Sequence, residues 1–167
     1  FTLALSLPEA NAQWMHDFSQ GLFALADAHG CPLVGGDTTQ GPLNICITVF
    51  GEIPPGQALL RSGAQAGDDI WVSGTLGDAA LALHCLWGRD ALPAPDLARA
   101  RQRLEQPSPR VALGQALRGI AHAAADVSDG LLGDLGHILK ASKVGADLMA
   151  SDAMTLIASS AYSTSAN

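Results

Sequence analysis

Residues 121–136 read AHAAADVSDGLLGDLG, and this stretch predicts more about the fold than any other part of the chain. Small apolar residues lead into two carboxylates three positions apart, Asp126 and Asp129, and a glycine follows before a new helical pattern. A buried strand that ends in acidic residues at the start of a helix is where α/β proteins commonly bind ligands. Like charges repel a bare phosphate, but carboxylate oxygens suit Mg²⁺, which can carry a nucleotide's phosphates. The structural alternative is that Asp126 or Ser128 caps the helix and Asp129 stabilises its first turn.

A second acidic glycine turn, GGDTT at residues 35–39, favours the metal and nucleotide interpretation. Gly36 and its neighbouring glycine would let the backbone approach a phosphate closely. Asp37 can then ligate a Mg²⁺ that bridges phosphate oxygens. Arg61 lies between the two acidic segments and can pair with a phosphate or stack on a base, although a surface salt bridge is the simpler alternative. Together these residues predict a nucleotide held between two domains.

Composition limits the classes of function. Hydrophobic residues make up 48% of the 167 residues, which is enough for a core, and the net charge of −7 argues against a nucleic-acid-binding surface. The three cysteines have no paired spacing, which indicates a reducing compartment such as the cytoplasm. No apolar run reaches the roughly 18 residues of a membrane span, so no membrane partner is expected. The chain lacks an initiating Met and starts within a strand pattern, so we expect a fragment.

Alternation, helical periodicity and turn residues predict an α+β first half and an α/β second half. The first half has predicted strands at residues 2–7, 32–34 and 43–53, and a helix that Asn11 caps and that runs to about His29 before Gly30. The second half has predicted strands at 69–73, 123–127 and 146–149, and helices at about 78–87, 96–104 (capped by Asp96), 111–120 and 131–142. The predicted domains are residues 1–60 and 69–150, joined by a connector at 61–68. Residues 151–167 are expected to be an irregular or non-native tail.

Several motifs, in order along the chain, resemble the thiamine-monophosphate kinase family. They are TLALSLP (2–8), LVGGDTT (33–39) with GPL (41–43), ALLRSGA (58–64), VSGTLGD (72–78), PSPR (107–110), and DVSDGL (126–131) with DLGHI (134–138). The match is collinear to about residue 148. Each motif alone is a weak signal, but the ordered set is specific.

The resemblance implies transfer of the γ-phosphate of ATP to thiamine monophosphate, which yields thiamine diphosphate. It also implies the two-domain fold of aminoimidazole ribonucleotide synthetase (the PurM-like fold), a homodimer through the first domain, and a cytoplasmic location. Residues that match ATP-binding positions are Gly36, Asp37, Arg61 and Ser128. Residues that match magnesium ligands are Asp37, Asp126 and Asp129. No further catalytic residue is assigned, because the acceptor is a phosphate monoester, already ionised near neutral pH, and needs no strong base.

The chain departs from the family pattern at both ends. The acidic Gly-Asp-Asp segment expected upstream is absent, and so are the later Gly-Gly-Glu-Asp segment and the aromatic residue that would hold thiamine. We therefore expect a fold truncated at both ends, and activity in the intact protein but not in this fragment. The alternatives are another ATP-using enzyme of the superfamily, of the selenophosphate synthetase or hydrogenase-maturation type, and a non-catalytic remnant that binds Mg-nucleotide.

Overall fold

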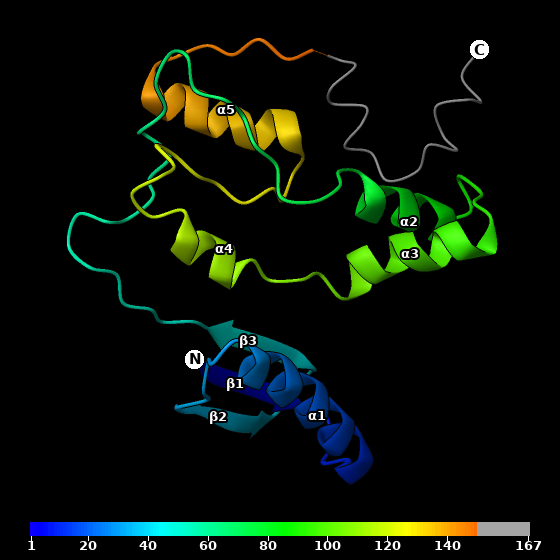
Figure 1. Cartoon of the computed structure of the whole chain (residues 1–167). Coiled ribbons are helices and arrows are strands. Elements are labelled where there is room, and N and C mark those ends of the chain that lie inside the picture. Colours follow the sequence, from blue (N-terminus) through cyan, green and yellow to red (C-terminus); the bar gives the residue numbers. More distant parts are fainter. Residues whose placement is uncertain (150–167) are drawn as a thin grey trace. The chain divides into compact units, whose positions relative to one another are not determined.

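The computed structural model describes residues 1–149, which divide into two compact units (Figure 1). The first unit comprises Phe1–Pro55 and the second begins at Gly56. The first contains a small sheet and one helix, and the described part of the second contains four helices joined by extended segments. The predicted tail at 151–167 lies outside the described residues.

The first unit is built on a three-stranded sheet in the order β2-β1-β3. Strand β1 (Thr2–Leu7) is parallel to β2 (Gly35–Gln40) and antiparallel to β3 (Asn44–Thr48). Leu5 lies between Thr38 and Ile45 in the register, and its side chain is buried. The central strand therefore supplies most of the buried apolar surface, while its two neighbours are exposed.

Helix α1 (Ala12–Ala28) begins and ends where the sequence predicts. The side-chain oxygen of Asn11 accepts the N–H of Trp14 at 2.9 Å, which satisfies one of the free donors of the first turn. Gly30 follows the helix with a φ of 60°, the left-handed conformation that glycine adopts without strain. Trp14 and Phe18 stack with ring centroids 5.0 Å apart, as expected for one apolar stripe.

Three predictions for the first unit are wrong in detail. Residues 32–34 were predicted to form a strand but lie before β2. Residues 35–39 were predicted to form a turn, but they belong to β2, and all six β2 residues pair with β1. The long strand predicted at 43–53 is only Asn44–Thr48. The register explains its length, because Thr48 pairs with Thr2, the first residue of β1, and the residues after Thr48 have no partner on that strand.

The second unit contains α2 (Asp78–Leu86), α3 (Ala94–Glu105), α4 (Val111–Ala116) and α5 (Leu131–Ser142). Helices α2 and α3 pack together, and small buried residues, Ala82 and Ala100, let their backbones approach. The cap of α3 is Pro93 and not Asp96, which lies in the first turn. Helix α4 is shorter than predicted. Among residues 1–149, no helix is long and apolar enough to span a bilayer.

The strands predicted at 69–73, 123–127 and 146–149 are not formed within the described part of the chain. A strand requires a hydrogen-bonded neighbour as well as a suitable sequence. The 123–127 segment makes one such contact, because the N–H of Ala124 donates to the carbonyl oxygen of Leu60 at 3.2 Å. It is thus an extended segment placed directly before the acidic turn and α5.

Candidate functional site

The acidic turn at residues 126–130 is closed by a carboxylate from α5. Asp134 is only 6% exposed, and its Oδ2 accepts the backbone N–H of Ser128 at 2.8 Å and of Asp129 at 3.0 Å. Successive N–H groups that point at one anionic oxygen form an anion-binding nest. Gly130 has a φ of 112°, a conformation that favours glycine, and it allows the chain to turn into the helix. The nest is therefore occupied by the protein's own Asp134.

These hydrogen bonds act on the ionisation of Asp134. The N–H groups of Asp129 and Ser128 hold the pKa of its carboxyl below the usual range, and the nearby His137 adds a smaller effect in the same direction. Burial raises the pKa but does not cancel these contributions. The side chain that closes the turn is therefore an ionised carboxylate at neutral pH.

The predicted capping of α5 by Asp126 or Ser128 is wrong. The N-cap of this helix is Gly130, which has no side chain to bond the first turn. Sequence reasoning missed Asp134. The available signal was an acidic residue in the first turn of the 131–142 helix, where a negative charge is favourable.

Arg61 and Asp126, both predicted from sequence, lie together. Arg61 Nη2 is 4.0 Å from Asp126 Oδ1, and the two side chains are 53% and 82% exposed. Such an exposed pair contributes about 1 kcal/mol or less to stability. The pair is loose and open to solvent, so both groups are available to a ligand.

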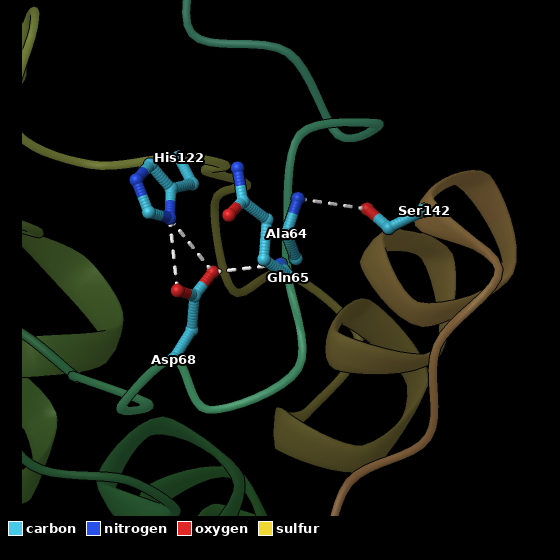
Figure 2. A network of polar contacts seen from close by, with 5 residues as sticks. All are labelled: Ala64, Gln65, Asp68, His122 and Ser142. Carbon is cyan, nitrogen blue, oxygen red and sulfur yellow. Dashed lines mark hydrogen bonds and ion pairs between the residues drawn. The ribbon is translucent and has the colours of Figure 1, made fainter.

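The segment that carries Arg61 is fixed to helix α5 by Ser142, at the end of that helix. The Ser142 hydroxyl donates to the carbonyl oxygen of Arg61 at 2.9 Å. It also accepts the N–H of Ala64 at 3.1 Å (Figure 2). A Cβ on Gly63 would lie 1.8 Å from the carbonyl oxygen of His122, so this backbone approach requires glycine. The backbone of Arg61 is thus held in place while its side chain reaches Asp126.

A second polar contact fixes the other end of this segment. Figure 2 shows the Asp68 carboxylate between the His122 ring and the backbone of Gln65. Its oxygens lie 2.8 and 3.0 Å from His122 Nδ1, and one of them accepts the Gln65 N–H at 2.8 Å. The Gln65 N–H and, secondly, the His122 side chain lower the pKa of Asp68, and burial opposes this. The segment that precedes α2 is therefore tied to the segment that precedes the acidic turn.

The carboxylates of Asp126 and Asp129 have the donor chemistry for Mg²⁺ but not a complete cage. Both residues are exposed, and within residues 1–149 no three acidic, histidine or cysteine side chains come together to hold a metal. Mg²⁺ at nucleotide sites usually takes one or two carboxylates together with phosphate oxygens and waters. The carboxylates of Asp126 and Asp129 therefore fit a Mg²⁺ that arrives with a polyphosphate. They do not fit a permanently bound structural ion.

Asp37 and Gly36 lie on β2, in the first unit. Asp37 is exposed, and its Oδ1 accepts the N–H of Thr38 at 2.8 Å. Gly36 has a φ of 146°, and a Cβ there would lie 1.9 Å from the carbonyl oxygen of Leu3. The close approach of the β1 backbone thus explains why residue 36 is a glycine. Its predicted contact with a phosphate stays a prediction, as do the ligand roles of Asp37, Arg61 and Ser128.

Two protein-family models match consecutive parts of the chain. Residues 1–53 match the profile described as AIR synthase related protein, N-terminal domain, and residues 55–161 match AIR synthase related protein, C-terminal domain. The two matches meet close to the boundary between the structural units at Pro55 and Gly56.

Among individual relatives, the thiamine-monophosphate kinase of Salmonella typhimurium is 51% identical over 146 residues, and that of Escherichia coli is 49% identical over 146 residues. Each alignment covers 87% of this chain and 45% of the relative, so the chain spans just under half the length of these curated proteins.

Two solved structures are also similar. The Stenotrophomonas maltophilia thiamine-monophosphate kinase is 56% identical, with a TM-score of 0.79 over 85% of this chain and 46% of that one. AaThiL complexed with AMPPCP and TMP is 26% identical, with a TM-score of 0.67 over 85% of this chain and 46% of that one. These matches confirm the resemblance drawn from the motifs and the predicted two-domain, PurM-like fold. The chain belongs to the AIR synthase related family, and within it is similar to the thiamine-monophosphate kinases.

Proposed function

We propose that this chain is part of an enzyme that transfers the γ-phosphate of ATP to thiamine monophosphate and so makes thiamine diphosphate. The observation that carries the proposal is the 51% identity, over 146 residues, with the Salmonella typhimurium thiamine-monophosphate kinase. The similarity to AaThiL complexed with AMPPCP and TMP supports a nucleotide and a thiamine phosphate as the two ligands. Of the superfamily alternatives, this one has direct support from named relatives.

The second unit would supply the ATP contacts Arg61 and Ser128 and the metal ligands Asp126 and Asp129, and the first unit would supply Gly36 and Asp37. The loose 4.0 Å pair between Arg61 and Asp126 supports this assignment, because a phosphate and a Mg²⁺ can replace its two halves at little cost. The N–H of Ser128 is occupied by Asp134, so the hydroxyl of Ser128 is the group left for ATP.

The proposed chemistry depends mainly on positioning and on charge. The acceptor is an ionised phosphate monoester, so the main barrier is the approach of two anions and not the removal of a proton. Bound Mg²⁺ would neutralise and align the phosphate groups. Asp126 and Asp129 would hold that ion from the acidic turn. Arg61 would bind a phosphate of ATP through its planar guanidinium, whose donors match phosphate oxygens.

The same proposal includes three further expectations. The intact enzyme is a homodimer, it is cytoplasmic, and this length of chain is inactive on its own. The three cysteines, Cys31, Cys46 and Cys85, are free thiols in the structure, which supports a reducing compartment. For this length of chain alone we expect ATP binding without phosphate transfer, because it spans 45% of its relatives.

The first test is calorimetric titration of ATP into the chain, with MgCl₂ and then with EDTA. We expect binding that requires Mg²⁺ and that is weakened roughly tenfold or more in Asp126→Asn, which keeps the shape of the side chain but removes its charge. Circular dichroism of each protein shows that it is folded. Absence of heat from the folded wild-type chain would contradict the site assignment.

The second test measures phosphate transfer in a full-length chimera. Residues 1–149 replace the aligned segment of the Stenotrophomonas maltophilia kinase, to which this chain is 56% identical. We expect the chimera to form thiamine diphosphate from ATP and thiamine monophosphate, and the same chimera with Asp126→Asn to lose most of that activity. A folded chimera that binds ATP but forms no thiamine diphosphate would favour the non-catalytic nucleotide-binding alternative.

A further inference from the structure

Asp134 is a buried charge to which the proposed function assigns no task. Of residues 1–149, two charged side chains are buried, Asp78 and Asp134, each 6% exposed. Burial of a carboxylate is costly unless the group is well hydrogen-bonded. Asp78 accepts a hydrogen bond from the hydroxyl of Thr75, close to its own helix start. Asp134 instead reaches back over five and six residues to the backbone of the acidic turn.

The contacts of Asp134 fix the turn from both its backbone and its side chain. Its N–H donates to the carbonyl oxygen of Gly130 at 3.0 Å, while its Oδ2 accepts from Ser128 and Asp129. Charge-assisted hydrogen bonds of this kind are about twice as strong as neutral ones. The backbone that carries Asp129 is therefore held by a group inside α5.

Occupation of the nest by Asp134 has a consequence for ligand binding. A helix N-terminus with free N–H groups is a general site for phosphate. Here Asp134 fills the donors of Ser128 and Asp129 and would repel a phosphate at the same place. The charged groups that the turn exposes are the carboxylates of Asp126 and Asp129. The turn is thus arranged to present oxygen ligands to a cation.

We propose that Asp134 is a positioning residue, whose carboxylate fills the anion nest at the start of α5 and so holds Asp126 and Asp129 in the geometry that binds a metal-nucleotide. The part of this proposal that concerns ligand binding rests on the proposed function. The part that concerns the turn does not. A turn that is already ordered loses less conformational entropy when the ligand binds.

The first experiment measures amide hydrogen exchange by NMR in the metal-free 167-residue chain. In the wild type, the amides of Ser128 and Asp129 are expected to be protected. Asp134→Ala removes the acceptor and should abolish that protection. Asp134→Asn keeps one acceptor oxygen, which suffices for both bonds because both go to Oδ2, and should retain part of it. Unprotected Ser128 and Asp129 amides in the folded wild type overturn the proposal without any variant.

The second experiment titrates ATP with MgCl₂ into the same proteins. Removal of a residue that orients metal ligands typically lowers the affinity for the metal by roughly ten- to hundredfold. We expect such a loss for Asp134→Ala and a smaller loss for Asp134→Asn, so the order of affinities follows the order of amide protection. Asp78→Ala is the matched control, since it removes an equally buried carboxylate of the same unit. Asp78→Ala should change neither the exchange protection of the Ser128 and Asp129 amides nor the affinity for Mg-ATP.

The outcomes separate the two proposals. Lost amide protection with unchanged Mg-ATP affinity overturns the positioning role of Asp134. Equal effects of Asp78→Ala and Asp134→Ala on affinity also overturn it, because the effect is then general destabilisation. If the wild-type chain is folded and protected at Ser128 and Asp129 but binds no Mg-ATP, the proposed function fails while the structural role of Asp134 in the turn stands.

Discussion

Asp37 and Asp126 lie on acidic, glycine-rich segments of the two units, but different forces hold the two segments in place. The segment with Asp37 is a strand whose six residues all pair with β1. The segment with Asp126 is a turn whose backbone is bound by a single carboxylate, that of Asp134. A strand held by backbone hydrogen bonds tolerates most side-chain substitutions, but not one that pushes the two backbones apart. A turn held by one side chain depends on that side chain.

The largest effect is expected when the backbone approach in the first unit is blocked. In Gly36→Ala the new Cβ would lie 1.9 Å from the carbonyl oxygen of Leu3, at a φ of 146° that alanine does not adopt without strain. We expect a loss of about 3 kcal/mol or more of unfolding free energy, measured by urea denaturation.

Gly35→Ala is the matched control, because no described atom lies within 4 Å of a Cβ at Gly35 and its φ is not positive. It should change stability by about 0.5 kcal/mol or less. Equal losses in the two variants would mean that β2 does not approach β1 as closely as Gly36 indicates.

The same test applies to the second unit, at the segment that carries Arg61. In Gly63→Ala the Cβ would lie 1.8 Å from the carbonyl oxygen of His122, and we expect a loss of about 2 kcal/mol. Gly114→Ala is the control, since it lies within α4 with no described atom within 4 Å, and alanine favours a helix by up to about 1 kcal/mol. A Gly63→Ala variant that gains stability as Gly114→Ala does would contradict this contact.

Features that depend on local sequence were predicted well. Helix α1 lies within a residue or two of its predicted bounds, because Asn11 and Gly30 are cap residues and the apolar stripe between them is periodic. Helix α5 has the predicted bounds, because Gly130 and the residues after it form a local start signal. The motifs also sufficed to identify the family, because their order along the chain is more specific than any one of them.

Features that depend on distant partners were not predictable. The 35–39 segment was interpreted as a turn because its glycines are typical of turns, but pairing with β1 makes it a strand. The end of β3 is set by the first residue of β1, which lies more than forty positions earlier. The role of Asp134 depends on a side chain that folds back to the turn, and sequence spacing does not show which way a side chain points.

The starts of helices α1 and α5 are also stabilised differently. Removal of the α1 cap is expected to lower the stability less than the glycine substitutions do. Helix α1 is capped by Asn11, whereas the donors before α5 are bound by Asp134 from inside the helix. Asn11→Ala should cost about 1 kcal/mol of unfolding free energy. Gln13→Ala, which removes only an exposed contact to Asp17 on the same helix, should cost less than about 0.5 kcal/mol. A larger loss for Gln13→Ala would mean that the Asn11 cap is not formed in solution.

The smallest effect concerns pH and the Asp68 contact of the second unit. The folded-state pKa of Asp68 is lowered, so its ionised form favours folding, and this contribution is complete above the ordinary value of 3.8 and disappears as the pH falls through the lower folded-state pKa. The difference in urea midpoint between wild type and Asp68→Asn should therefore shrink as the pH falls below 3.8. The difference should be small, because His122 and Asp68 are partly exposed. A difference that instead grows as the pH falls below 3.8 would show that the ionised carboxylate opposes folding, contrary to its hydrogen bonds with Gln65 and His122.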